Sequence, residues 1–319
     1  MAVYTDLTDE ELRDLLAAYD LGAVLSFKGI AEGVENSNFL LETERGRFIF
    51  TIYEKRVARS DLPFFMDVME QLADRAFPAP RPMRRRDGAL LSEVRGKACA
   101  LIAFLSGVSP KKPSAAQCRA IGAALAGMHI ALDGFPAARA NALGPHAWRP
   151  LIAPKLALAE SLRAGLAADI DDDLDAVLQA WPHALPQGII HADLFPDNAL
   201  FLGDRVAGVI DFYFACADAL AYDLAVCINA WCFEPRGAFN ITKGRALIAG
   251  YESVRPLSAA ERAALPILAR GAALRFFATR LADWADTPPG ALVRPKDPLD
   301  YADRLAFHRT AQGPGDYGA

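Results

Sequence analysis

The 319-residue chain is 53% hydrophobic and 23% charged, the composition of a folded globular protein rather than of a disordered one. A formal net charge of −5 and a pI near 5.6 argue against nucleic acid or an anionic membrane as the main partner, because either would require a basic surface. No apolar run reaches the roughly 18 residues that cross a bilayer, and no signal-peptide pattern is present. Five cysteines without CxxC spacing favour reduced thiols and a cytoplasmic location, while the oligomeric state is not predicted.

The first hundred residues predict a small β-rich lobe with one inserted helix. Thr8 and Glu11 form a capping box for a first helix. A second helix is expected at 60–76, and the expected strands are 39–43, 47–53, 89–93 and 97–104. The apolar run 101–107 ends in a glycine and is expected to be the hinge. We therefore expect an N-terminal lobe at 1–104 and a C-terminal lobe at 105–319.

From residue 105 onward the pattern predicts helices. They are expected at 114–129, 151–178, 223–231 and 258–284, with capping boxes at the start of the first and the last. His129 is expected to pack rather than to bind a ligand, and Asp223 is expected to cap its helix. The acidic run 169–175 predicts a solvated face, and the Pro- and Gly-rich tail from residue 288 is expected to be loosely held. The fold class that follows is α+β, with two lobes.

The stretch 191–211, HADLFPDNALFLGDRVAGVID, places polar groups of defined chemistry at an informative spacing. Two apolar segments, 199–202 and 206–210, are separated by a Gly-Asp pair, which predicts a β-hairpin. If Leu202 pairs with Arg205, Asn198 lies opposite Val209 and on the same face as Asp211. These two side chains would then be about 5 to 8 Å apart at one end of the hairpin.

Three oxygen-bearing side chains in this stretch suit phosphoryl transfer. The amide of Asn198 and the carboxylate of Asp211 are hard ligands of the kind that Mg²⁺ takes while phosphates and waters complete its coordination. Asp193 could orient and deprotonate an alcohol that attacks a γ-phosphate. The alternative is that all three are turn formers, but their order between two apolar strands favours the chemical role. His191 is expected to fix the loop by hydrogen bonding.

A β-rich lobe, a hinge and a helical lobe that contains HADLFPDN and then IDF resemble the aminoglycoside phosphotransferase and choline kinase superfamily. The resemblance extends from Leu25 to Trp284 and includes the LAGMH stretch at 125–129. It implies a protein-kinase-like fold, ATP as the phosphate donor and a small-molecule acceptor. Residue by residue, Asp193 matches the catalytic base of the family, and Asn198 and Asp211 match its Mg²⁺ ligands.

The run from 188 to 234, and above all its part from Phe212 to Glu234, is similar to the homoserine kinase branch of that superfamily. This resemblance implies ATP-dependent phosphorylation of the hydroxyl of L-homoserine to O-phospho-L-homoserine on the way to threonine. Two alternatives stay open. One is a kinase for another small hydroxyl compound such as choline, methylthioribose or an aminoglycoside, and the other is a nucleotide-binding protein without catalysis.

The small lobe departs from the superfamily, whose second strand usually presents a Lys or Arg to the ATP phosphates. Thr51 stands at that position, and Lys55 lies roughly 13 Å further along the strand at about 3.3 Å per residue. We expect Lys28, or backbone amides near Gly29 and Gly33, to replace the missing cation. Glycines at this spacing also occur in an ordinary hairpin.

Two further contacts with ligands are expected. The backbone at Phe104, within the hinge, is expected to meet the purine, because ligands collect in clefts between lobes. The amino-acid end of the acceptor requires a cation for its carboxylate and an acceptor for its ammonium group. The residues that we expect to supply these groups are Tyr213, Asn229, Trp231, Arg275 and Arg280.

Overall fold

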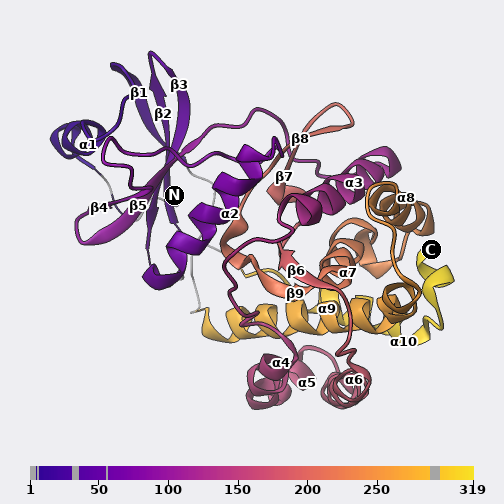
Figure 1. The fold of residues 1–319 in the computed structure, drawn as a ribbon. Helices are drawn as coiled ribbons and strands as arrows, with labels where there is room; N and C mark the ends of the chain where they lie inside the picture. Colours follow the sequence, from indigo (N-terminus) through magenta and orange to yellow (C-terminus); the bar gives the residue numbers. More distant parts are fainter. Residues whose placement is uncertain (1–4, 6, 31–35, 55–56, 288–294) are drawn as a thin grey trace.

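The computed structural model describes residues 5, 7–30, 36–54, 57–287 and 295–319, in which a β-rich part precedes a larger, mainly helical part (Figure 1). The first part contains an antiparallel five-stranded sheet with the strand order β1-β2-β3-β5-β4. Its elements are α1 (Asp9–Leu16), β1 (Val24–Ile30), β2 (Asn36–Thr43), β3 (Gly46–Tyr53), α2 (Leu62–Asp74), β4 (Leu91–Val94) and β5 (Lys97–Ala103). The predicted α+β fold class is confirmed.

The second part is built from helices around two short two-stranded sheets, β6-β9 and β7-β8. The helices are α3 (Ala115–Ala131), α4 (Pro145–Ile152), α5 (Leu156–Leu162), α6 (Leu166–Ala180), α7 (Leu220–Trp231), α8 (Ile241–Glu252), α9 (Ala259–Asp286) and α10 (Leu299–Thr310). In Figure 1 the long helix α9 lies between α7 on one side and α4 and α6 on the other, and it packs against all three. The strands are β6 (Gln187–Ile190), β7 (Ala199–Leu202), β8 (Arg205–Val209) and β9 (Cys216–Ala219).

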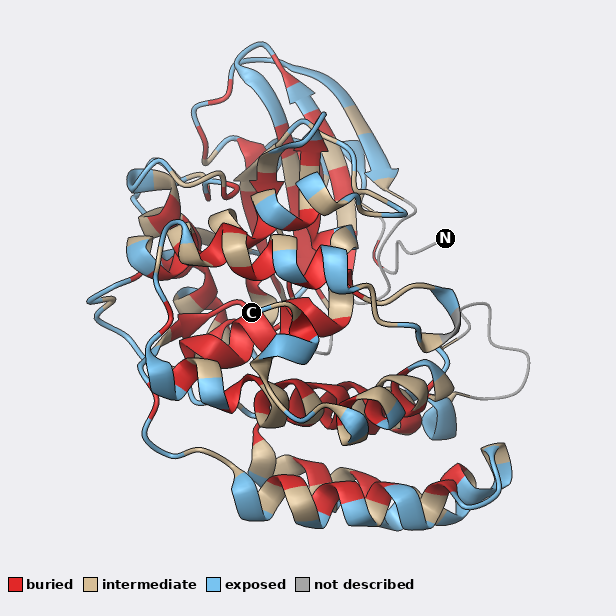
Figure 2. Ribbon diagram, turned by 90° about the vertical axis from the view of Figure 1, so that its right-hand side faces the viewer, coloured by how far each residue is buried: buried red, intermediate tan, exposed pale blue. Residues whose placement is uncertain are grey.

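Two hydrophobic cores hold the sheet from opposite faces. Helix α1 covers one face, where Leu12 packs with Phe50 and other strand residues. On the other face Tyr53 and Phe65 belong to a core that continues without interruption into the helical part, as the buried residues in Figure 2 show. Burying each such side chain contributes roughly 1.5 to 3 kcal/mol, so this continuous core fixes the sheet on the helices.

The helix predicted at 151–178 is wrong, because the structure divides this segment. Helix α4 ends at Ile152, a short 3-10 turn at Ala153–Lys155 leads into α5, and α6 begins after Gly165. Pro154 has no amide hydrogen to donate within a helix. Gly165 adopts a φ of +81°, in the left-handed region that glycine enters without strain.

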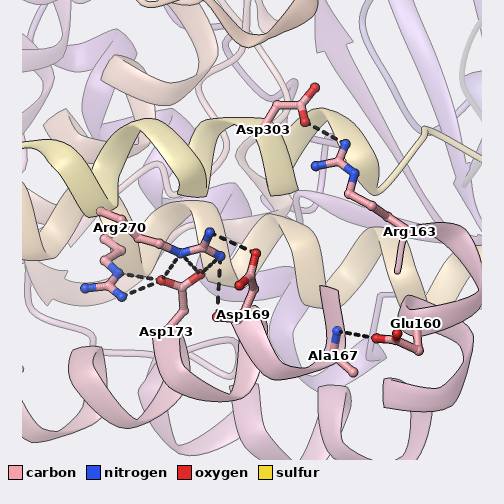
Figure 3. A network of polar contacts seen from close by, with 8 residues as sticks. Glu160, Arg163, Ala167, Asp169, Asp173, Arg270 and Asp303 are labelled. Atoms are coloured by element: carbon pink, nitrogen blue, oxygen red, sulfur yellow. Dashed lines mark hydrogen bonds and ion pairs between the residues drawn. The ribbon is translucent and has the colours of Figure 1, made fainter. Parts of the chain in front are cut away.

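The acidic run is exposed at Asp169, Asp172 and Asp175 as expected, but not at Asp173. The expectation of a loosely held tail is wrong for the described residues from 295 onward, while residues 288–294 lie outside the described residues. Asp173, within that run, is fully buried and accepts hydrogen bonds from Arg270 of α9 and Arg309 of α10 at 2.7 Å each (Figure 3). Helix α10 packs along α9. A buried carboxylate with two guanidinium partners therefore joins α6, α9 and α10.

The connection between the two parts is short. Strand β5 ends at Ala103, and Val108 already exchanges two backbone hydrogen bonds of 3.0 Å with Phe201 of β7. The lobe boundary between 104 and 105 and the hinge at 101–107 stay predictions. None of the described helices has both the length and the apolar character needed to cross a bilayer.

Candidate active site

The predicted hairpin is confirmed as strands β7 and β8, but its register differs from the prediction by one residue. Leu202 pairs with Arg205 as expected, yet Leu200 pairs with Gly208 and Ala199 with Val209, so Ala207 forms a β-bulge. Asn198 therefore lies opposite Ile210, whose amide donates to the Asn198 carbonyl at 3.0 Å. The predicted pairing of Asn198 with Val209 is wrong.

Asp193 and Asn198 are held together by direct hydrogen bonds. The Nδ2 group of Asn198 donates to the Asp193 carbonyl at 2.8 Å and to its Oδ2 atom at 3.4 Å. Among the described residues Oδ1 of Asn198 has no hydrogen-bond partner, so this oxygen is available to a ligand. The side chain of Asp193 keeps 20% exposure, which lets a small molecule reach its carboxylate.

The loop that contains Asp193 is fixed from below by Asp223, which is fully buried. Its carboxylate accepts from the amides of His191 at 2.7 Å and Ala192 at 2.9 Å. It also accepts from Nε2 of His129 at 3.1 Å. Helix α7 begins at Leu220 with Ala219 as its N-cap, so the prediction that Asp223 caps this helix is wrong. His129 likewise does more than pack, because it donates to Asp223, which in turn holds the Asp193 loop.

His191 fixes the same loop, as predicted. Its Nδ1 atom accepts from the Asp193 amide at 3.2 Å, which requires the proton to reside on Nε2. That Nε2–H group donates to the Ile210 carbonyl at 3.0 Å. Burial lowers the pKa of His191, which favours this neutral tautomer. The histidine thereby ties the Asp193 loop to the residue that precedes Asp211.

Arg275 lies behind the loop and sets the electrostatics of Asp193. It is 3% exposed, donates through Nη1 to the Ala192 carbonyl, and places Nη1 at 3.7 Å from Oδ1 of Asp193. Burial raises the pKa of Asp193, and the positive charge of Arg275 partly offsets that rise. The result is a carboxylate that is more basic than a free aspartate.

Asp211 ends the hairpin in a left-handed conformation with φ +66° and ψ 62°, which turns the chain out of strand β8. Two residues later the hydroxyl of Tyr213 meets that of Tyr53 at 3.0 Å. Burial raises the pKa of Tyr213, and the nearby Asp211 charge raises it further, while contacts with Tyr53 and Thr51 act in the opposite direction. Asp211 therefore lies close to the place where the helical part meets strand β3.

Of the expected nucleotide-binding residues, Lys28 and Thr51 share one face of the sheet. Lys28 pairs with Leu40, and Thr51 pairs with Asn38, two residues away along β2. Lys28 is exposed, whereas Thr51 is buried. Gly29 belongs to β1 next to Lys28, while Gly33 and Lys55 lie outside the described residues. The Phe104 amide already donates to the Arg47 carbonyl at 3.1 Å, so its carbonyl alone is left for a purine.

The residues expected at the amino-acid end separate in the structure. Asn229 is buried and hydrogen-bonded to Ala225, Ala269 and His308. Trp231 is also buried and donates to the Leu194 carbonyl. The assignment of these two residues to substrate binding is therefore wrong. Arg280 is engaged by the Asp297 carbonyl at 2.8 Å and by Asp300 at 2.9 Å. The sequence reasoning overlooked Lys296, an exposed cation that acts on the Asp193 charge and lies 3.5 Å from Asp197.

The side-chain oxygens of Asn198 and Asp211 suit a divalent cation bound with phosphate. The carboxylate of Asp211 and the amide oxygen of Asn198 are hard ligands. Within the described residues no cluster of three His, Cys, Asp or Glu side chains could hold a metal ion by itself. Mg²⁺ commonly takes one or two protein ligands and completes its shell with phosphates and waters, so two protein groups are sufficient.

Comparisons with known proteins identify the class that this fold and site define. The model of the phosphotransferase enzyme family matches residues 26–257, and the chain belongs to this family. Two relatives, each named homoserine kinase, come from Caulobacter vibrioides strain NA1000 / CB15N and Sinorhizobium fredii strain NBRC 101917 / NGR234. The first is 60% identical, with 97% of this chain and 98% of the relative covered, and the second is 58% identical, with 100% and 98% covered. An amicoumacin kinase in complex with AMP-PNP and Ca²⁺ shares the fold, with a TM-score of 0.66 at 15% identity over 95% of this chain and 92% of that one.

Proposed function

We propose that the chain is an ATP-dependent homoserine kinase, which converts L-homoserine to O-phospho-L-homoserine in threonine biosynthesis. The observation that carries this proposal is the pairing of Asp193 with Asn198 on a loop anchored by buried Asp223. The identity of the substrate is inferred from relatives named homoserine kinase, which are about 60% identical over nearly the whole chain. The predicted cytoplasmic location stays a prediction.

Asp193 acts in this proposal as the general base. The side-chain hydroxyl oxygen of homoserine forms a bond to the γ-phosphorus of ATP, the bond from that phosphorus to the bridging oxygen breaks, and ADP leaves. The proton of the hydroxyl passes to the Asp193 carboxylate. A base with a raised pKa accepts this proton more readily, and the hydrogen bond from Asn198 fixes its orientation.

Asn198 and Asp211 would hold Mg²⁺, through Oδ1 and the carboxylate respectively. When bound, the metal would neutralise charge on the phosphates. The fit rests on the chemistry of the donor set, because the Nδ2 group of Asn198 is occupied by Asp193 and leaves the oxygen for the ion. The ordered turn from Ile210 into Asp211 keeps the second ligand in place.

The nucleotide would lie against the sheet face that carries Lys28 and Thr51. On this face Leu40, Ile49 and Ile102 form a partly exposed apolar shelf, because the register pairs Leu40 with Ile49 and Ile49 with Ile102. A purine is planar and apolar on its faces, so such a shelf suits it. Lys28 on β1 pairs with Leu40 of this shelf, so it is placed to approach the phosphates.

Lys296 would bind the carboxylate of homoserine. It is 65% exposed, its Nζ atom lies 5.5 Å from the ring centre of Phe195, and its charge acts on Asp193. A substrate whose hydroxyl meets Asp193 would thus place its carboxylate within reach of this cation. Its contact with Asp197 at 3.5 Å is exposed and weak, so a carboxylate can displace it.

The test is ADP release from ATP and Mg²⁺ with a panel of alcohols, measured on wild-type protein and Asp193→Asn. We expect turnover with homoserine, little with choline or an aminoglycoside, and a loss of about 10²- to 10⁴-fold in kcat for Asp193→Asn with nearly unchanged nucleotide affinity. Turnover with another alcohol in place of homoserine would refute the substrate. Nucleotide binding without any turnover would refute the kinase assignment.

A further inference from the structure

A chain of hydrogen-bonded hydroxyl groups crosses from the helical part to the sheet and ends at Asn38. The hydroxyls of Tyr53 and Tyr213 lie 3.0 Å apart, and Tyr213 also contacts Thr51. Oγ1 of Thr51 in turn donates to Oδ1 of Asn38 at 2.8 Å. Because the Thr51 hydroxyl is the donor in this contact, the carbonyl end of the Asn38 amide faces Thr51.

This arrangement leaves the other end of the amide unused. Among the described residues, Nδ2 of Asn38 has no hydrogen-bond partner, and its side chain is partly exposed. Asn38 pairs with both Ile30 and Thr51, so it lies on the same sheet face as Lys28, whose partner Leu40 is two residues further along β2. Tyr213 links it to Asp211, because the charge of Asp211 acts on the Tyr213 hydroxyl. The two N–H donors of Asn38 therefore belong to the sheet face that carries Lys28 and Thr51.

We propose that Nδ2 of Asn38 donates hydrogen bonds to the phosphate oxygens of the nucleotide, and that Thr51, its partner across the strands, positions this amide. The proposal deepens the proposed kinase function and rests on it. Thr51 is 2% exposed and its proton is committed to Asn38, so it acts through the amide rather than on the nucleotide. A neutral amide offers directed donors without the charge of a lysine.

The decisive variant is Asn38→Asp. Aspartate keeps the acceptor oxygen that Thr51 requires and has nearly the same shape, but it replaces the two donors with an anionic oxygen. We expect binding of AMP-PNP with Mg²⁺, measured by titration calorimetry, to weaken about 10- to 100-fold, because a hydrogen bond to a charged group is lost and a repulsion is added. Binding of adenosine, which has no phosphates, should change less than about twofold.

Matched variants separate a contact from general damage. Gln117→Glu makes the same amide-to-acid change at the partly exposed capping-box position of α3, where glutamate can also accept from the Ser114 amide, and should leave AMP-PNP binding unchanged. Thr51→Val removes the positioning hydroxyl while keeping the shape and should weaken AMP-PNP binding about 3- to 10-fold, and Thr51→Ser should restore it. Asn38→Ala serves in place of Asn38→Asp if the latter does not fold.

Two results would overturn the proposal. One is AMP-PNP binding by Asn38→Asp at wild-type strength, and the other is an equal loss of adenosine and AMP-PNP affinity, which a purely structural role would produce. Because these binding measurements need no acceptor, their outcome does not depend on whether homoserine is the substrate. Failure of wild-type protein to phosphorylate homoserine would refute the proposed function, while unaltered AMP-PNP binding in an active Asn38→Asp enzyme would refute this inference alone.

Discussion

The substitution Asp223→Asn should remove the support of the candidate catalytic loop without touching any substrate. Asp223 is fully buried and accepts hydrogen bonds from the amides of His191 and Ala192 and from Nε2 of His129. An asparagine presents one oxygen in place of two and directs its NH₂ group at a donor. At least one of these three donors would lose its partner.

The expected cost follows from these contacts. A hydrogen bond to a charged group contributes about 1.5 to 3 kcal/mol, and an unsatisfied buried donor costs about 1 to 3 kcal/mol. Losing one bond and leaving one donor without a partner should lower the free energy of unfolding by about 3 to 5 kcal/mol. Ala192 is held at φ +62°, a conformation that costs about 1 to 3 kcal/mol in a residue other than glycine, so the weakened loop should relax. The displacement of Asp193 should then lower kcat about 10²-fold.

Urea denaturation measures the first quantity, and ADP release with saturating homoserine and ATP measures the second. Asp218→Asn is the matched control, since Asp218 also accepts from a side chain and an amide, Asn141 and Ala219, but is only half-buried. We expect the control to lose about 1 kcal/mol and little activity. If Asp223→Asn loses no more stability than Asp218→Asn, or keeps wild-type kcat, the proposed role of this anchor is refuted.

Three further outcomes are expected. The acid limb of the pH profile of kcat/KM should lie above the usual aspartate pKa of about 3.9, because burial raises the pKa of Asp193. Arg275→Gln should move this limb to still higher pH, while Arg275→Lys should not. An unmoved limb in Arg275→Gln would contradict the proposed effect of Arg275 on Asp193. Asp173→Ala should lower the free energy of unfolding by about 3 to 5 kcal/mol in urea, since it removes the charge-assisted hydrogen bonds of a buried carboxylate with Arg270 and Arg309, and a change below about 1 kcal/mol would refute the reasoning. Lys296→Ala should raise KM for homoserine about 10-fold without changing KM for 3-aminopropanol, which lacks the carboxylate, and equal changes would exclude a carboxylate contact.

Local signals in the sequence predict local structure well in this chain. The capping boxes at Thr8, Ser114 and Ser258 are all present where expected, because their partners lie three residues away. The hairpin was predicted for the same reason, yet its register was not. The bulge places Gly208 where an added Cβ atom would lie 2.8 Å from Cδ1 of Leu105, a contact across about a hundred residues that no local pattern reveals.

Errors occur where a distant partner changes the environment of a residue. The acidic run of α6 has the pattern of a solvated face, but Asp173 is buried by Arg270 and Arg309, which lie 97 and 136 residues away in the sequence. The same cause underlies the wrong expectation for the tail, since α10 is fixed through Arg309 to that carboxylate. Charge pattern alone predicts exposure, and only the fold supplies the compensating cations.

The residues of the candidate site also differ in how far the sequence predicts them. The residues expected to contact the reactants were predicted, whereas the residues that hold the Asp193 loop in place were not. Asp193, Asn198 and Asp211 fall within one loop and one hairpin, so their spacing already indicated a common site. Asp223 and His129 reach that loop from α7 and α3, and in isolation each had the pattern of an ordinary helical residue. Because the loop conformation depends on these distant bonds, the short motif carries the chemistry only within this fold, and the same residues in a free peptide would have no reason to converge.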